Sequence, residues 1–101
     1  MVELRCLHGT FQEPGVWAEL EERLGGDEVR VVAETIEPPA SGGASAWAEA
    51  FCARVARAPR PEPPARRILL GYSLGGRLAM HALAGCAGAW DAAVLVSAHP
   101  G

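Results

Sequence analysis

The sequence predicts an α/β fold, in which a parallel sheet of about four strands carries helices on both faces. Short apolar runs typical of strands alternate with segments whose apolar residues recur at helical spacing. A Gly-x-Ser-x-Gly at residues 71–75 follows one apolar run directly and opens a helical segment. Because strands that alternate with helices pair in parallel through right-handed crossovers, we expect helices on both sides of the sheet.

The first half of the chain contains two predicted strands and one helix. Residues 2–7 alternate briefly and run into a His-Gly pair, which predicts a strand that delivers a loop. Apolar residues at helical spacing predict a helix over residues 16–24, ended by Gly25 and the glycine after it. Residues 28–36 predict the second strand.

The second half contains two helices and two strands. Ser45 is the expected N-cap of a helix. One apolar face of that helix is formed by Trp47, Phe51, Val55 and Ala58. Residues 59–64 include four prolines and predict a stiff connector. The strand before the Gly-x-Ser-x-Gly and its helix follow, and residues 92–96 predict the last strand.

The length, charge and apolar runs of the chain limit the partners and the location that we expect. The 101 residues fit one domain, residues 1–101, with a formal net charge of −3. The absence of a basic cluster argues against nucleic acid or an anionic membrane surface as a partner. The N-terminal residues carry charges, at Glu3 and Arg5, where a signal peptide needs an apolar core, and no apolar run approaches the ~20 residues of a membrane span. We therefore expect a cytoplasmic protein.

The three cysteines favour reduced, buried thiols. Cys6, Cys52 and Cys86 are odd in number, far apart, and lie in predicted strand and helices. The sequence has no CxxC pair and no His-Cys cluster. We expect neither a metal nor a cofactor.

Gly71, Ser73 and Gly75 match the nucleophile elbow, a strained turn that exposes a serine at the carboxyl edge of a parallel sheet. Glycine is needed at both flanking positions because a Cβ would prevent the close backbone approach. The alternative is an ordinary glycine-rich turn between a strand and a helix. The preceding strand and following helix favour the elbow.

A serine nucleophile needs backbone N–H groups that stabilise the developing oxyanion. In the elbow architecture one donor is the residue after the serine, here Leu74, and the second follows an earlier strand. The His8-Gly9 loop places Thr10 or Phe11 at that position. A plain turn after the first strand is the alternative interpretation of that loop.

A base for Ser73 is difficult to find. In this architecture the histidine follows the serine in the chain, which leaves His81 and His99. His81 lies two turns along the helix and is expected to be a packing or surface residue. No acid follows His99, and Asp91 precedes its strand and so belongs at the opposite edge. Without a base the chain alone should be nearly inactive.

These features resemble the α/β-hydrolase superfamily over nearly the whole chain. The resemblance is carried by residues 7–9, 71–77 and 94–97. Within the superfamily, the chain is most similar to the 2-succinyl-6-hydroxy-2,4-cyclohexadiene-1-carboxylate synthases of menaquinone biosynthesis. The specific likenesses are Tyr72 before the serine, Arg77 after it, the spacing of Trp17 from the His-Gly pair, and the closing Ser-Ala-His-Pro-Gly.

The resemblance to the synthases implies a lyase on this fold. Ser73 would remove a proton so that pyruvate leaves, and Arg77 would hold a substrate carboxylate. Tyr72 and His8 are expected to contact the small-molecule substrate. Thr10 and Gln12 replace the Phe and Gly usual in the His-Gly loop, which puts the pocket shape in doubt.

By the same resemblance, the chain corresponds to the third to sixth strands of a partial α/β-hydrolase fold. We therefore expect a truncated domain, with the acid, the histidine and the lid missing. The last strand would have an exposed edge, which predicts dimerisation or aggregation. Two alternatives stay open: a general carboxylesterase or acyl hydrolase, and a non-catalytic α/β module in which Ser73 is only a turn residue.

Overall fold

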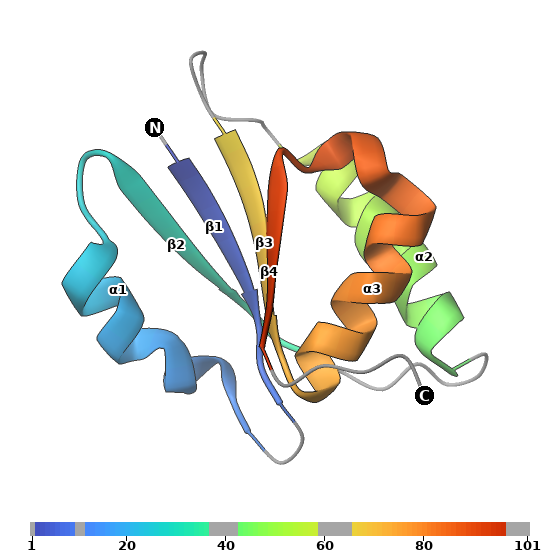
Figure 1. Ribbon diagram of the computed structural model, residues 1–101, viewed down its shortest axis with the longest axis horizontal. Coiled ribbons are helices and arrows are strands. Elements are labelled where there is room, and N and C mark those ends of the chain that lie inside the picture. The colour runs from blue at the N-terminus through green and yellow to red at the C-terminus, as the bar shows by residue number, and fades with distance from the viewer. Residues whose placement is uncertain (1, 10–11, 37–42, 59–65, 97–101) are drawn as a thin grey trace.

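Four parallel strands form one sheet in the order β2-β1-β3-β4 (Figure 1). The computed structural model describes residues 2–9, 12–36, 43–58 and 66–96. The strands are β1 (Val2–Leu7), β2 (Val29–Glu34), β3 (Arg66–Tyr72) and β4 (Ala92–Val96). The predicted α/β class is thereby confirmed, and all carboxyl ends of the strands meet at one edge.

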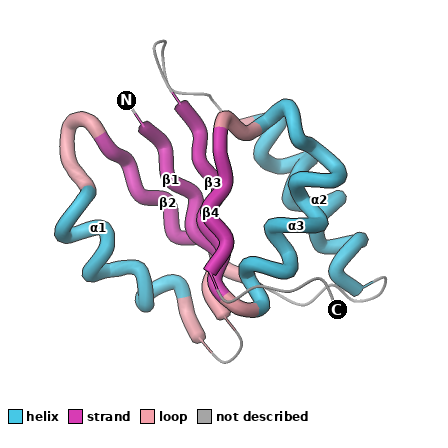
Figure 2. The backbone as a smooth tube through the Cα atoms, in the orientation of Figure 1, coloured by secondary structure: helices cyan, strands magenta, loops and turns pink. Residues whose placement is uncertain are grey.

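Helices cover both faces of the sheet. The helix α1 (Ala18–Leu24) lies on one side, whereas α2 (Gly43–Arg57) and α3 (Leu74–Cys86) lie together on the other (Figure 2). Short 3-10 turns occur at η1 (Pro14–Trp17) and η2 (Ala87–Ala89). No helix in the described ranges is long and apolar enough to cross a bilayer.

Two predicted helix starts were wrong. The first helical segment begins at Pro14 as a 3-10 turn rather than at residue 16, since proline's fixed φ suits the first turn of a helix. The helix α2 begins at Gly43, so Ser45 lies inside the first turn and is not the N-cap. The connector predicted over residues 59–64 lies outside the described residues.

The main core lies between the sheet and the pair α2–α3. The predicted apolar face of α2 is confirmed for Trp47, Phe51 and Val55, which are buried, whereas Ala58 is half-buried and lies just beyond the end of the helix. The rings of Trp47 and Phe51 stack with centroids 4.8 Å apart, and Phe51 also stacks on Trp90 at 5.9 Å. Leu69 of β3 is fully buried against this cluster, so α2, α3 and the sheet share one apolar layer.

The cysteine prediction was wrong for two of the three residues. Cys52 of α2 and Cys86 at the end of α3 form a disulfide, with Cα atoms 5.9 Å apart. The pairing became possible because α2 and α3 pack side by side, which a separation of 34 residues does not reveal. Cys6 is a free, buried thiol as expected.

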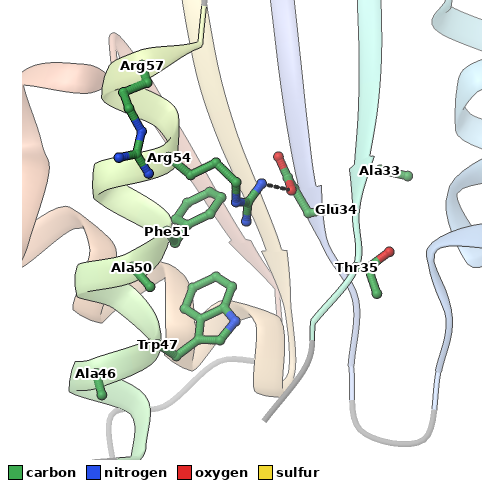
Figure 3. A pocket seen from close by; sticks show the side chains of 9 residues that line it. All are labelled: Ala33, Glu34, Thr35, Ala46, Trp47, Ala50, Phe51, Arg54 and Arg57. Atoms are coloured by element: carbon green, nitrogen blue, oxygen red, sulfur yellow. Dashed lines mark hydrogen bonds and ion pairs between the residues drawn. The ribbon is translucent and has the colours of Figure 1, made fainter. Parts of the chain in front are cut away.

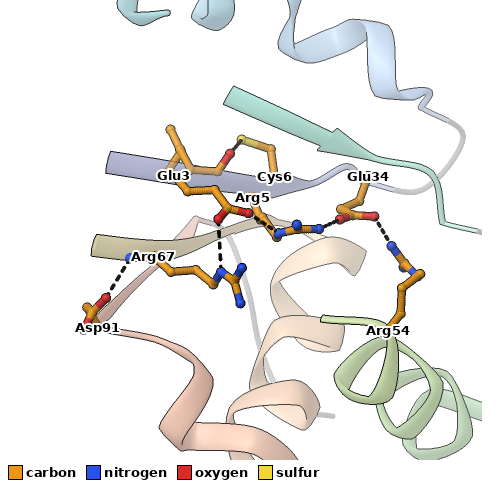
Figure 4. Close-up of polar contacts among 8 residues, drawn as sticks. Glu3, Arg5, Cys6, Glu34, Arg54, Arg67 and Asp91 are labelled. Atoms are coloured by element: carbon orange, nitrogen blue, oxygen red, sulfur yellow. Dashed lines mark hydrogen bonds and ion pairs between the residues drawn. The ribbon is translucent and has the colours of Figure 1, made fainter. Parts of the chain in front are cut away.

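A chain of ion pairs, buried except at Arg54, runs across the sheet and ends at α2 (Figure 4). Arg67 Nε lies 3.1 Å from Glu3 Oε2, and Glu3 Oε1 accepts a hydrogen bond from Arg5 Nε at 2.5 Å. Arg5 then bonds Glu34 Oε1 at 2.5 Å, and the other oxygen of Glu34 accepts from Arg54 of α2 at 2.6 Å. The chain therefore joins β3, β1, β2 and α2.

These charges were not expected inside the protein. The sequence shows Glu3 and Arg5 as the polar positions of an alternating strand, yet both are buried, as are Glu34 and Arg67. A buried charge is tolerated when it is paired and hydrogen-bonded. Removing one partner of such a pair costs about 3–5 kcal/mol, because the other charge is left uncompensated.

The strand β4 leaves apolar side chains exposed. All five of its residues are exposed, including Val94, Leu95 and Val96. β4 pairs only with β3 in the described structure, while α1 packs mainly against β2. An uncharged apolar edge strand of this kind favours pairing with another chain.

We expect the purified chain to self-associate through β4. Val94→Lys places a charge at the centre of the apolar edge and should keep the mass near the 10.6 kDa of a single chain. Light scattering over a concentration series measures the change. Leu24→Lys alters an exposed apolar residue of α1 and should not prevent association. A wild-type chain that stays monomeric at high concentration would contradict the expectation.

Candidate active site

The carboxyl ends of β1 and β3 bring the two predicted loop motifs together. In the sheet register Leu7 pairs with Gly71, so the residues after each strand are neighbours. A Cβ added to Gly9 would lie 3.3 Å from Ser73 Cβ and 3.1 Å from Tyr72 Cδ1. The His-Gly loop therefore packs directly against the serine turn.

Ser73 occupies a strained backbone conformation between β3 and α3. With φ 55° and ψ −115°, it is the one non-glycine residue of positive φ in the described chain. Such a conformation costs about 1–3 kcal/mol and persists only where the surroundings fix it. Here the Ser73 N–H donates to Val96 O at 2.9 Å, and the Arg77 N–H donates to Ser73 O at 3.0 Å.

The two glycines of the motif have no room for a side chain. A Cβ on Gly71 would lie 2.5 Å from Gly75 O and 2.7 Å from the Cα of Gly76. A Cβ on Gly75 would collide with the Leu7 carbonyl and lie 2.6 Å from His8 O. The first turn of α3 thus rests on the ends of both β3 and β1, which is the steric requirement expected of the elbow.

Among the predicted oxyanion donors, Leu74 lies in the part of the chain that the structure describes. Leu74 is the first residue of α3, and the N–H groups of a helix's first turn have no partner within the helix. Leu74 follows the serine, and its side chain is half-buried. The other predicted donors, Thr10 and Phe11, lie outside the described residues.

His8 is held by backbone groups at both ring nitrogens. Its Nε2 accepts the Ile36 N–H at 3.3 Å, which assigns the proton to Nδ1, 3.0 Å from Gly9 O. The residue is buried and ties the end of β1 to the segment after β2. A substrate contact through either nitrogen, as predicted from the resemblance, would require one of these bonds to break.

Tyr72 and Arg77 lie on the surface beside Ser73. Tyr72 is 39% exposed and lines a cavity of about 490 Å³ between α1 and the uncovered side of β3 and β4. Arg77 is exposed in the first turn of α3, and no ion pair involves it among the residues described.

The described residues place no base beside Ser73. His81 is half-buried eight residues along α3, about 12 Å away at the rise of an α-helix. Asp91 precedes β4 at the opposite edge, as predicted, and its Oδ2 accepts the Arg67 N–H at 2.7 Å. His99 lies outside the described ranges.

Cys6 is not a competing nucleophile. Burial raises the pKa of its thiol from 9.0 to about 12. The reactive form of cysteine is the thiolate, which is scarce at neutral pH when the pKa is so high. No group of three or more His, Cys, Asp or Glu in the described part of the chain is arranged to hold a metal ion.

A second cavity lies away from the serine. About 620 Å³ opens between α2 and the outer strand β2, and Arg54 reaches across it to Glu34 (Figure 3). Trp47 and Phe51 form its apolar wall. None of the residues predicted for the active site lines this cavity.

Sequence reasoning missed the contact that holds the His-Gly loop. Gln12 Oε1 accepts the Gly9 N–H at 2.8 Å, and the Gln12 N–H donates back to Gly9 O at 3.2 Å. The only signal was that Gln12 departs from the Gly usual at this position in the resembled synthases. That departure indicated an altered loop but no contact.

Comparison with known families agrees with this arrangement. A model described as the alpha/beta hydrolase family matches residues 6–101. The chain belongs to the alpha/beta hydrolase family. The resemblance to the superfamily is thereby confirmed for this α/β-hydrolase chain. No curated protein sequence matches it, so the likeness to the menaquinone-pathway synthases stays a proposal.

In this α/β hydrolase, we expect Gly75→Ala to lower the free energy of unfolding by about 1–3 kcal/mol, because the new methyl group meets backbone atoms that cannot move away. Gly85→Ala in the same helix is the matched control. Its Cβ would meet only Cys52 Sγ at 3.7 Å, so it should stabilise the chain by up to about 1 kcal/mol. Urea unfolding measures both. Equal stability of the two variants would contradict the close contact at Gly75.

Proposed function

We propose that Ser73 is the reactive group of an α/β-hydrolase-type enzyme site that acts on a small-molecule substrate. The observation that carries the proposal is the positive φ of Ser73 at the carboxyl edge of the sheet. Ligands of open α/β sheets bind beyond the carboxyl ends of the strands. If residue 73 only formed a turn, glycine would adopt the positive φ at a lower free-energy cost than serine. A strained serine at that edge is therefore explained more readily by a chemical role.

The proposed chemistry follows from the groups around the serine. A base takes the Ser73 proton, and the oxygen then attacks a carbonyl carbon or removes a substrate proton. The Leu74 N–H, at the start of α3, would stabilise the developing oxyanion, and each such donor is worth about 10²–10³ in rate. Because no base lies beside Ser73 in the described residues, we expect the isolated chain to react slowly.

A fluorophosphonate probe tests Ser73 directly. We expect slow labelling of the wild-type chain, faster labelling when imidazole is added as an external base, and none with Ser73→Ala. Ser45→Ala removes an exposed serine of α2 and should label like wild type. Intact-mass spectrometry measures the adduct. Labelling that survives in Ser73→Ala, or that is absent from wild type even with imidazole, would contradict the proposal and favour a non-catalytic module.

The finer proposal is a synthase-like lyase that eliminates pyruvate in menaquinone biosynthesis. Arg77 favours it, because an exposed guanidinium one turn after Ser73 can bind a substrate carboxylate through two hydrogen bonds. In that reaction Ser73 acts as a base rather than as a nucleophile. A carboxylesterase or acyl hydrolase is the second candidate, in which Ser73 forms an acyl-enzyme and Arg77 has no catalytic task.

Arg77→Gln separates the two candidates. We expect it to raise KM for the carboxylate-bearing pathway intermediate about 10–100-fold, and to leave hydrolysis of a neutral p-nitrophenyl ester unchanged. Arg57→Gln, at an exposed arginine of α2, is the control and should change neither. Pyruvate release and nitrophenol release are measured in imidazole. Ester hydrolysis without any pyruvate release would leave the acyl hydrolase as the better proposal.

The sequence predicts a cytoplasmic location. The Cys52–Cys86 disulfide argues against it, because disulfides persist mainly in oxidising compartments. Counting free thiols in protein extracted under alkylating conditions would decide which state the cell maintains.

A further inference from the structure

Gly9 makes three hydrogen bonds through its backbone. Its N–H donates to Gln12 Oε1 at 2.8 Å. Its carbonyl accepts from the Gln12 N–H at 3.2 Å and from His8 Nδ1 at 3.0 Å. Gly9 is buried, so an unsatisfied N–H there would carry a desolvation penalty. Among the described residues, the Gln12 side chain alone supplies the acceptor.

Gly9, held by these hydrogen bonds, lies opposite the turn that contains Ser73. An added Cβ on Gly9 would lie 2.9 Å from Gln12 Oε1, 3.1 Å from Tyr72 Cδ1 and 3.3 Å from Ser73 Cβ. The contact with Ser73 comes from the end of β1, whereas the hydrogen bonds of Ser73 come from β4 and α3. A strained residue keeps its conformation only when several independent contacts fix it. The Gly9 backbone approaches Ser73 from the β1 side, so closely that an added Cβ would be crowded.

We propose that Gln12 is a positioning residue for Ser73. By accepting a hydrogen bond from the Gly9 N–H, Gln12 holds the Gly9 backbone in its position beside the Ser73 turn. The same bond occupies the Gly9 N–H and prevents it from binding the developing oxyanion itself. This inference rests on the proposed function of Ser73 for its catalytic meaning, whereas the restraint on the turn is a separate physical claim.

The residue type matters because only a side-chain acceptor of this length reaches the Gly9 N–H from the exposed position 12. Gln12→Leu keeps the side-chain size and loses the acceptor. Gln12→Glu keeps both. Glu13→Leu makes the corresponding apolar change at the next exposed residue, whose side chain forms no cap bond to the η1 turn.

Two measurements on the whole chain test the inference. Amide hydrogen exchange by NMR reports on the N–H groups of Gly9 and Ser73, and fluorophosphonate labelling in imidazole reports on the Ser73 oxygen. For Gln12→Leu we expect about tenfold faster exchange at both amides and about tenfold slower labelling. Gln12→Glu should restore both exchange rates to near wild type, and Glu13→Leu should change neither measurement.

The outcomes separate the inference from the proposed function. Faster exchange at Gly9 with unchanged exchange at Ser73 would overturn the inference, because Gln12 would then hold only its own loop. Failure of Gln12→Glu to restore exchange at Ser73 would overturn it as well. If wild type is not labelled, the proposed function fails, and the Ser73 exchange rates still decide the positioning claim. If Gln12→Leu does not fold, Gln12→Asn, with a shorter acceptor, takes its place with the same expected direction.

Discussion

The first turn of α3 rests on the backbone at the ends of β1 and β3, and the remaining packing depends on that contact. Because neither Gly71 nor Gly75 has a Cβ, α3 can start directly above the Leu7 carbonyl. This position sets where α3 lies on the sheet, and α2 packs against α3 over the same apolar layer. The backbone must then turn sharply between β3 and α3, and Ser73 is the residue that takes the positive φ.

The buried ion pairs give the sheet a second, electrostatic constraint. Apolar side chains alone would tolerate a different pairing of the strands at modest cost. A shift of one residue in the register of β1, however, would turn Glu3 and Arg5 to the other face and separate them from Arg67 and Glu34. The pairs therefore favour one register of β1 against both of its neighbours. The ion pairs add little to the net free energy of folding, since desolvation offsets much of the attraction between buried charges. Their main effect is therefore on the register of the strands.

Local sequence patterns were sufficient for the strands and for the elbow, and insufficient wherever two distant segments meet. Two such features depend only on residues that are adjacent in the sequence: the strand over residues 92–96 and the turn at residues 71–75. Periodicity and glycine spacing therefore predict them. The Cys52–Cys86 pair and the burial of Glu3 depend on tertiary neighbours, which no short window contains. The bond from Gln12 to Gly9 is local, but a polar residue in a loop has no pattern that predicts its partner.

The Cys52–Cys86 disulfide closes a covalent ring that contains the end of α2, all of β3, the Ser73 turn and α3. A protease that cuts the chain once anywhere inside this ring leaves both halves attached to each other through sulfur. Ser73 and the helix that begins beside it would stay tethered to α2 after such a cut. Reduction would remove the tether, so the cleaved chain would separate only where thiols are kept reduced.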